Sequence, residues 1–172
     1  MKIRPLRDEP VGLDLVDTVW VDQGELLDQF DTAEGVAAWL ADHDLPGSGS
    51  DERVRDHLVE ARAAMRDALE GRGTDRLNAV LSHGSRRPQL RGAEPYELVV
   101  VDDAERHAAW VAAADLVRVL GERAERVRHC ANPECVLWFV DISKNGSRRW
   151  CSMDVCGNRA KVGRFNQRQK AR

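Results

Sequence analysis

The sequence lacks the features of a secreted or membrane protein. No run of about 18 apolar residues occurs among its 172 residues, so no segment is expected to span a membrane. The first residues, MKIRPLRDEPVGLDLVDTVW, lack the apolar stretch and the small-residue cleavage site of a secretory signal peptide. We therefore expect a cytoplasmic protein, a setting in which stable structural disulfides are rare.

Motifs of catalysis are also missing. The sequence contains no glycine-rich phosphate loop, no Gly-x-Ser-x-Gly motif and no two histidines four residues apart. Asp14 and Asp17 lie about one helical turn apart, but a helix cap or a hydrogen bond to nearby backbone explains them more simply than a catalytic carboxylate pair. The sequence therefore predicts a protein that is not an enzyme.

Positive charge is scarce in the first three quarters of the chain. Residues 1–126 carry 16 Lys and Arg against 26 Asp and Glu, whereas residues 127–172 carry 10 against 3. A basic end on an acidic body is typical of a segment that binds a polyanion. The alternative is that the two parts attract each other within the molecule, and charge alone does not decide between them.

Apolar periodicity predicts that residues 1–127 form a mainly helical domain with a small sheet. The expected helices cover 11–21, Asp31 to the loop at 44–51, Ser50 or Asp51 to Gly71, a short stretch after Gly73, and Asp102 or Asp103 to about 127. The expected strand is 96–101, and HGSRRPQLRG (83–92) is expected to be a loop. The expected apolar stripe of the last helix is Trp110, Ala113, Ala114, Val117, Leu120 and Ala124.

Cysteine is absent from the first 129 residues, and all four cysteines follow in the pattern Cys130-x4-Cys135-x15-Cys151-x4-Cys156. Two matched pairs separated by a hairpin-length insert are typical of a zinc site. No Cys-x-x-Cys redox motif is present, and four thiolates leave no open position for catalysis. We expect one structural Zn²⁺ per chain, with iron as the alternative metal.

The residues around the cysteines predict a knuckle, a β-hairpin and a helix, which together resemble a treble clef. VLWFVDI (136–142) is strand-like on both faces, so we expect the N-terminal domain and the final helix to cover it. Asn145-Gly146 predicts a type I′ turn. The segment after Cys156 predicts a helix with a basic stripe, formed by Lys161, Arg164, Arg168 and Arg172.

Basic residues on such a scaffold could neutralise phosphates, and arginine could read guanine edges. Two alternatives stay open: an RNA-binding protein, and a zinc-stabilised module that assembles with an acidic protein surface. The candidate nucleic-acid contacts are Lys144, Arg148, Arg149, Asn158, Arg159, Lys161, Arg164 and Arg168.

The segment HCANPECVLWFVDISKNGSRRWCSMDVCGNRAKVGRF resembles the CGNR zinc finger, a name that matches Cys156-Gly157-Asn158-Arg159. LDLVDTVW and DTAEGVAAWLADHDL are similar to the ABATE-type domain that accompanies this finger in stress-induced transcription regulators. The resemblance implies a DNA-binding zinc module whose ligands are the four cysteines. It also implies that Asn158 and Arg159 cap the helix or contact phosphate. In that family the first helix usually carries Asn-Thr, where this chain has Asp17-Thr18.

Taken together, the sequence predicts an α+β protein. A mainly helical N-terminal domain (1–127) with a small sheet precedes a treble-clef-like four-cysteine zinc finger (128–172). The expected function is that of a bacterial DNA-binding transcriptional regulator, in which the first domain mediates dimerisation, senses a small-molecule effector, or does both. The candidate effector pocket consists of Asp17, Thr18, Trp20 and Trp39.

Overall fold

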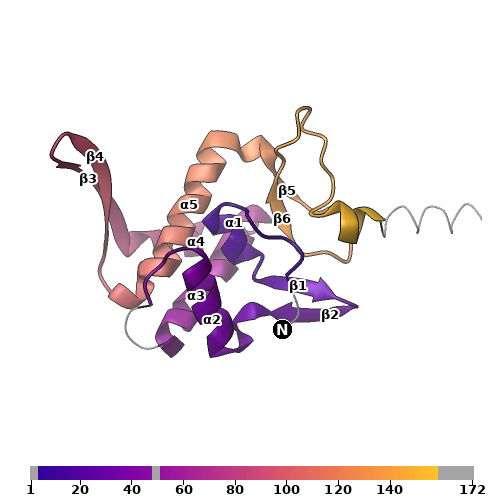
Figure 1. The fold of residues 1–172 in the computed structure, drawn as a ribbon, viewed down its shortest axis with the longest axis horizontal. Helices are drawn as coiled ribbons and strands as arrows, with labels where there is room; N and C mark the ends of the chain where they lie inside the picture. Colours follow the sequence, from indigo (N-terminus) through magenta and orange to yellow (C-terminus); the bar gives the residue numbers. More distant parts are fainter. Residues whose placement is uncertain (1–3, 48–50, 159–172) are drawn as a thin grey trace, which may run out of the picture.

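A computed structural model describes residues 4–47 and 51–158 of the chain (Figure 1). Its helices are α1 (Val11–Val16), α2 (Ala33–Asp42), α3 (Asp51–Leu69), α4 (Asp75–Ser82) and α5 (His107–Arg123). Its strands are β1 (Val19–Asp22), β2 (Glu25–Asp28), β3 (Gly84–Arg91), β4 (Glu94–Val101), β5 (Val127–His129) and β6 (Trp138–Val140). Short helical turns lie at η1 (Gln29–Asp31), η2 (Ala104–Arg106), η3 (Ala124–Arg126) and η4 (Met153–Gly157).

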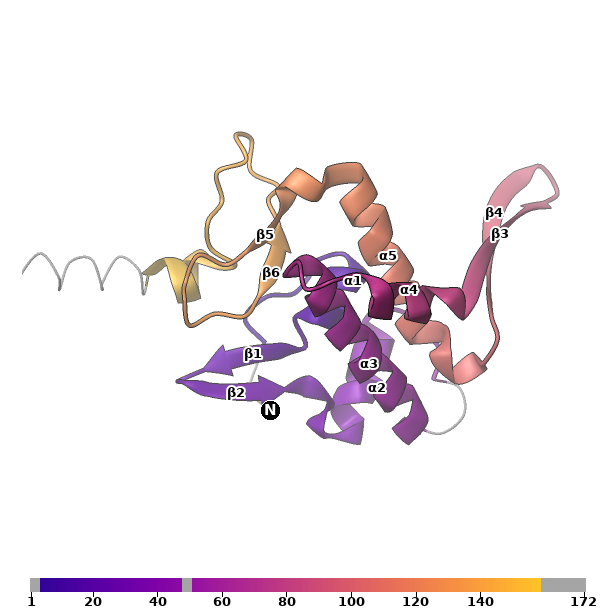
Figure 2. The ribbon, with the colours of Figure 1, turned by 180° about the vertical axis from the view of Figure 1, so that it is seen from behind.

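The strands form three separate two-stranded antiparallel sheets, β1-β2, β3-β4 and β5-β6. The helices pack together in the middle of the molecule, and the β3-β4 hairpin and the cysteine-bearing segment project from opposite ends (Figures 1 and 2). The expected α+β class, with a helical domain, small sheets and a C-terminal four-cysteine cluster, is therefore confirmed. The predicted domain boundary at 127–128 falls inside β5 and stays a prediction.

The main core lies where α1 crosses α3 and α5. Leu13, Leu58, Met65 and Leu116 are fully buried there. Gly12 permits the close crossing of α1 and α5, because a Cβ at this position would lie 2.6 Å from the backbone nitrogen of Leu116. Burial of this apolar face supplies most of the free energy that holds the short helix α1 in place, since six residues are too few for a stable isolated helix.

The predicted helix over 11–21 is wrong in its second half, because α1 ends at Val16 and β1 begins at Val19. Trp20 pairs with Leu27 across a tight turn. Gln23 and Gly24 form this turn with φ values of 51° and 87°, the positive angles that a two-residue hairpin turn requires. The β-branched residues around Trp20 suit a strand as well as a helix face, and the turn decides between them.

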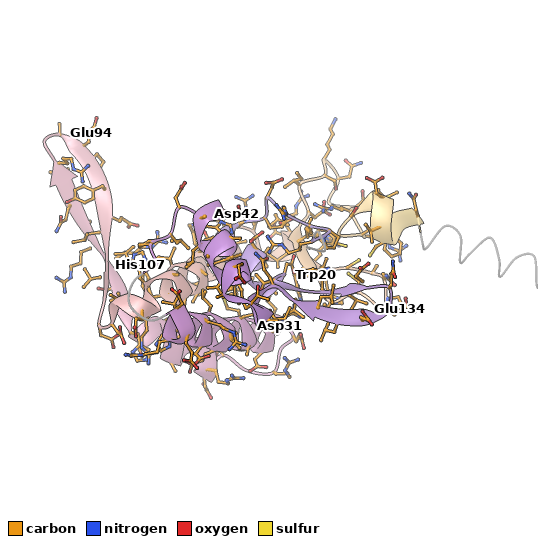
Figure 3. The ribbon with its side chains drawn as sticks, turned by 60° about the horizontal axis from the view of Figure 1, so that its bottom comes forward. Trp20, Asp31, Asp42, Glu94, His107 and Glu134 are labelled. Atoms are coloured by element: carbon orange, nitrogen blue, oxygen red, sulfur yellow. The ribbon has the colours of Figure 1, made fainter. Side chains whose placement is uncertain are left out.

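Residues 83–92, predicted as a loop, instead contain strand β3. Pro88 is tolerated because the two-stranded hairpin leaves one edge of β3 unpaired. Gly92 has a φ of 63° and turns the chain back into β4, which begins two residues before the predicted strand. Glu94 lies at the exposed tip of this hairpin (Figure 3).

Two helix details also differ from expectation. Thr32, not Asp31, caps α2, and its hydroxyl accepts a hydrogen bond from the Gly35 nitrogen at 3.1 Å. In α5, Val117 is 45% exposed, because the helix turns its other side towards α1 and α3. Ala124 lies beyond the end of α5, in η3. The buried residues of α5 include Ala108, Ala109, Trp110, Ala112, Ala113, Asp115, Leu116 and Val119.

Asp14 is the centre of a buried polar cluster that joins the N-terminal segment to α1 and α2. Arg4 donates to both carboxylate oxygens of Asp14, at 2.8 and 2.7 Å. Trp39 Nε1 and His43 Nε2 lie 2.9 and 2.8 Å from the same Oδ1. Burial raises the pKa of Asp14, but the hydrogen bond to His43 and the charge of Arg4 outweigh it and hold the pKa below its ordinary value of 3.8.

Replacing Asp14 by Asn should lower the free energy of unfolding at pH 7 by about 3–5 kcal/mol, because the buried Arg4 guanidinium loses its counter-charge. Since the folded-state pKa of Asp14 is lowered, its contribution is complete above the unfolded value of 3.8 and is lost as the pH falls through the folded value. Urea unfolding at pH 7 and near pH 3 measures both effects. The control is Asp56→Asn, whose carboxylate is exposed. A difference that does not shrink on acidification would contradict the ionic role.

Candidate metal centre and basic surface

The four cysteines converge on one point. The Sγ atoms of Cys130, Cys135, Cys151 and Cys156 all lie within 4.8 Å of one another, and the four residues are at most 7% exposed. The Sγ atom of Cys151 is 3.8 Å from that of Cys135 and 3.6 Å from that of Cys156. A tetrahedron of sulfurs around Zn²⁺ with bonds of about 2.3 Å has edges of about 3.8 Å. The donor set and its spacing therefore fit one structural zinc ion.

Local backbone structure positions each cysteine pair. Cys130 follows β5, and its nitrogen donates to the carbonyl of Leu137 at 2.9 Å, which closes the first knuckle. Ser152 caps η4, where the nitrogen of Cys156 donates to the carbonyl of Ser152 at 3.1 Å. N–H groups also face the sulfurs: the Asn132 amide lies 3.5 Å from Cys156 Sγ, and the Cys151 nitrogen lies 3.5 Å from Cys130 Sγ. These donors stabilise negative charge on sulfur, as a thiolate site requires.

The thiols cannot all ionise without a cation. Hydrogen bonds from Cys135 and Cys151 lower the pKa of Cys130 to about 2. The same hydrogen bond raises the pKa of Cys135 to about 12, and the bonds of Cys151 to Cys130 and Cys135 raise the pKa of Cys151 far above its ordinary value. A divalent cation at the centre removes this competition, because it holds its thiolate ligands deprotonated. No disulfide joins the cysteines.

The hairpin of this module is not where the sequence placed it. Strand β6 pairs with β5, so the two strands flank the first cysteine pair, and residues 147–151 do not pair with β6. Asn145-Gly146 does not form a type I′ turn, because only Gly146 has a positive φ. Instead, the nitrogen of Gly146 donates to the carbonyl of Ser143. Ile142, expected to be covered, is 80% exposed.

Asp141 is the reason for this difference. Its carboxylate is buried and accepts hydrogen bonds from the Ser143 nitrogen at 2.9 Å, the Ser143 hydroxyl at 2.6 Å and the Arg148 nitrogen at 3.0 Å. Arg128 adds an ion pair at 3.4 Å. The N–H groups of the loop therefore donate to a carboxylate, whereas in a hairpin they would donate to the carbonyl groups of a neighbouring strand.

The N-terminal domain binds the free edge of β6. Asp17 Oδ1 accepts from the Trp138 nitrogen at 2.9 Å, and Glu9 Oε2 accepts from the Val140 nitrogen at 2.8 Å. Arg66 of α3 donates to the carbonyl of Val136 at 3.2 Å. These side chains take the place of a third strand at the edge of β6. Of the expected cover of its faces, packing of Val140 in the main core is present, and the expected final helix lies outside the described residues. We call Glu9, Asp17 and Arg66 the edge-binding residues.

Arg148 is occupied within the zinc module. Its guanidinium donates to the carbonyls of Trp150 and Cys151 at 3.0 and 2.5 Å and lies 4.3 Å above the Phe139 ring. Glu9 lies 3.8 Å from it. These contacts give Arg148 a structural role in holding the second cysteine pair.

The remaining candidate nucleic-acid contacts are of two kinds. Lys144, Arg149 and Asn158 are exposed on the zinc module. Arg149 lies over the Trp150 ring, and the Asn158 amide donates to the carbonyl of Asp154 at 3.4 Å. The other candidates lie outside the described residues: Arg159, Lys161, Arg164 and Arg168.

The structure does not bring the four candidate pocket residues together around a cavity. Trp39 is fully buried beside Asp14, and Thr18 is fully buried, where its hydroxyl donates to the Leu15 carbonyl. Asp17 faces β6, and Trp20 lines a cavity whose described lining includes none of the other three.

Sequence reasoning missed Glu9, Arg66 and Asp141 as residues that build the site. Arg66 directly follows the core residue Met65 in α3, and only the structure shows that its side chain is mostly shielded by its neighbours. No sequence signal identified Glu9. Asp141 interrupts the apolar run VLWFVDI, and a carboxylate at that position is a recognisable turn former.

Two family models match the chain. The ABATE model, described as "Putative stress-induced transcription regulator", matches residues 9–123. The CGNR zinc finger model matches residues 126–169. A search of the curated proteins finds no match to the chain. The first match ends at the last residue of α5, and the second begins just before β5.

Metal analysis of the native protein should give one zinc per chain. Cys151→Ser should reduce this value to near zero, because three thiolates bind zinc far more weakly than four, and should disorder the module while α3 and α5 keep most of the helical circular dichroism. The control is Ser147→Ala, an exposed position in the same loop. Native protein without zinc would contradict the assignment.

Asp17→Asn should raise the free energy of unfolding at pH 8 by about 1–3 kcal/mol. Asp17 is 1% exposed, its Oδ2 has no hydrogen-bond partner among the described residues, and burial raises its pKa well above 3.8. Stability is therefore lost as the pH rises from 3.8 through the folded-state pKa, since the unfolded chain releases this proton more easily.

An asparagine keeps an acceptor for the Trp138 nitrogen and does not ionise. The stability gained by Asp17→Asn should therefore shrink towards pH 4, where the native Asp17 is protonated. Asp17→Ala is the matched control and should lower stability, because the Trp138 N–H then has no acceptor. Urea unfolding of the three proteins between about pH 4 and pH 8 measures this. An Asn variant less stable than the native protein at pH 8 would contradict the account.

Proposed function

Because the chain belongs to the ABATE family and carries a CGNR zinc finger, we propose that it regulates transcription by binding DNA through the outer face of its zinc module. The observation that carries this proposal is the distribution of unpaired positive charge. Lys144 and Arg149 are exposed on the loop between the cysteine pairs, and neither forms an ion pair within the described part of the chain.

Most arginines of the N-terminal domain are, by contrast, neutralised by carboxylates. Arg62 binds Asp28, and Arg118 binds Asp115 and Glu122. Further ion pairs involve Arg4, Arg53, Arg72, Arg76 and Arg86. An acidic body with paired arginines repels DNA, so electrostatic attraction is left to the C-terminal end.

A groove of about 560 Å³ beside Arg149 supports the proposal. Ser147, Ser152 and Trp150 also line it. Hydroxyl groups and arginine are common donors to phosphate oxygens. The sequence continues from Asn158 with further basic residues, including Lys161 and Arg164, which extends positive charge beyond this groove.

In this proposal the zinc ion is structural and the protein is not an enzyme, since four thiolates occupy all tetrahedral positions. The protein acts in the cytoplasm, where cysteine thiols stay reduced. Within the described residues, no helix has both the length and the apolar character needed to cross a lipid bilayer. Dimerisation would double the contact area of one small finger, and stress would act through a small-molecule effector.

Lys144→Ala and Arg149→Ala should each weaken binding to duplex DNA and reduce the slope of log K against log salt by about 1, because each removes one phosphate contact. Fluorescence anisotropy with fragments selected from bacterial genomic DNA, measured over a range of salt concentrations, gives both quantities. Arg87→Ala is the control, since Arg87 is an exposed arginine on the distant β3-β4 hairpin.

Arg148→Ala should instead lower zinc affinity, because it removes donors to the Trp150 and Cys151 carbonyls. Tighter binding of single-stranded RNA than of duplex DNA would overturn the proposal in favour of RNA binding. Absence of binding to both nucleic acids at low salt would overturn it in favour of a protein-assembly module.

A further inference from the structure

A second cavity, of about 260 Å³, lies in the N-terminal domain. Its walls come from three parts of the chain: the N-terminal segment, the β1-β2 hairpin and the start of α2. Figure 3 shows Trp20, which lines this cavity, on the β1-β2 hairpin. The volume lies just below the range of about 300–1,000 Å³ that is usual for small-molecule pockets.

Part of the cavity lining is apolar. Trp20 and Leu27 are cross-strand partners in the β1-β2 hairpin, and both line the cavity. Trp20 is 7% exposed, so its ring is held in place by the protein around it. A flat apolar group could pack against this pair and gain the free energy of burying its own surface.

Another part of the lining carries positive charge. Arg7 is exposed, and no hydrogen bond or ion pair occupies its guanidinium within the described residues. Arg4 is 6% exposed and binds Asp14 through Nη1 and Nη2, but its buried Nε has no partner there. The remaining charged wall residue, Asp28, is neutralised by Arg62. Arg7 therefore leaves the cavity with a net positive charge.

The start of α2 adds to this potential. Thr32 caps the helix and lines the cavity together with Gln29 and Gly35. The N-terminal end of a helix carries partial positive charge, which stabilises a nearby anion. Arg7, which has no partner within the described residues, and the start of α2 thus line the same cavity as the apolar pair Trp20 and Leu27.

From this arrangement we infer that the cavity binds a small organic acid, with its carboxylate towards Arg7 and the start of α2 and a flat apolar body against Trp20 and Leu27. Inorganic phosphate would satisfy the positive end but leave the apolar wall without contacts. A neutral apolar molecule would bury that wall but leave Arg7 without a partner.

The position of Trp20 links this cavity to the metal centre. Trp20 belongs to the same buried cluster as the four cysteines, and Leu27 packs against that cluster. A ligand that fixes Trp20 therefore stabilises the packing around the zinc ligands, and by linkage zinc strengthens ligand binding. This inference does not rest on DNA binding, and its test contains no nucleic acid.

Benzoate is the probe, measured by isothermal titration calorimetry on the full zinc-loaded chain. We expect saturable binding of one benzoate per chain, with benzyl alcohol and inorganic phosphate binding at least tenfold more weakly. Arg7→Ala should weaken benzoate binding at least tenfold, while the matched variant Arg87→Ala, an exposed arginine on the β3-β4 hairpin, should leave it unchanged. Leu27→Gln should also weaken binding, since it makes the wall polar.

Absence of saturable binding, or binding that Arg7→Ala leaves intact, would overturn the site. Equal binding of benzyl alcohol would overturn the anionic character of the ligand, and equal binding of phosphate would overturn its apolar body. The linkage has a separate readout: benzoate should slow the transfer of zinc to a chelator at least twofold. An unchanged rate would overturn the coupling between cavity and metal centre.

Discussion

Mutual repulsion between four thiolates is the constraint on which the C-terminal part of this protein depends. Four thiolates whose sulfurs lie within 4.8 Å of one another stay together only around a cation, and the elements nearby are too short to hold them in place. Strands β5 and β6 have three residues each, and η4 is a single turn. The knuckle, the loop around Asp141 and η4 therefore form one unit with the metal. Arg148 links two parts of that unit, because its guanidinium lies over the Phe139 ring and donates to the carbonyl of Cys151.

The zinc module is also continuous with the helical domain. Val140 belongs to the main core, whereas Leu6 and Trp20 belong to the cluster around the cysteines. The edge-binding residues Glu9, Asp17 and Arg66 add polar contacts across the same boundary. Two segments that match different family models thus share both of their buried clusters. The packing of the first segment and the packing around the metal ligands are therefore not independent of each other.

Spacing was enough to identify the four ligands, because a metal site is defined by residue type and interval along the chain. Periodicity was enough for α3, whose apolar positions repeat over nineteen residues. Periodicity failed at Trp20, because the apolar pattern there fits a strand as well as a helix face. The turn at Gln23-Gly24 selects the strand. Periodicity failed also at Asp141. The composition of this segment suggests a hairpin, but the Asp141 carboxylate binds the N–H groups that would otherwise pair with a strand. Contacts between distant residues, such as that of Glu9 with Val140, leave no trace in a single sequence.

Strand β6 shows one more consequence of these contacts. A short strand with a free edge is a template onto which a second chain can add its own strand, and that reaction leads to aggregation. Here the edge N–H groups of Trp138 and Val140 are already bound to carboxylates of the same molecule. The boundary between the two segments therefore also protects the module from growing into an intermolecular sheet, even in a crowded cell.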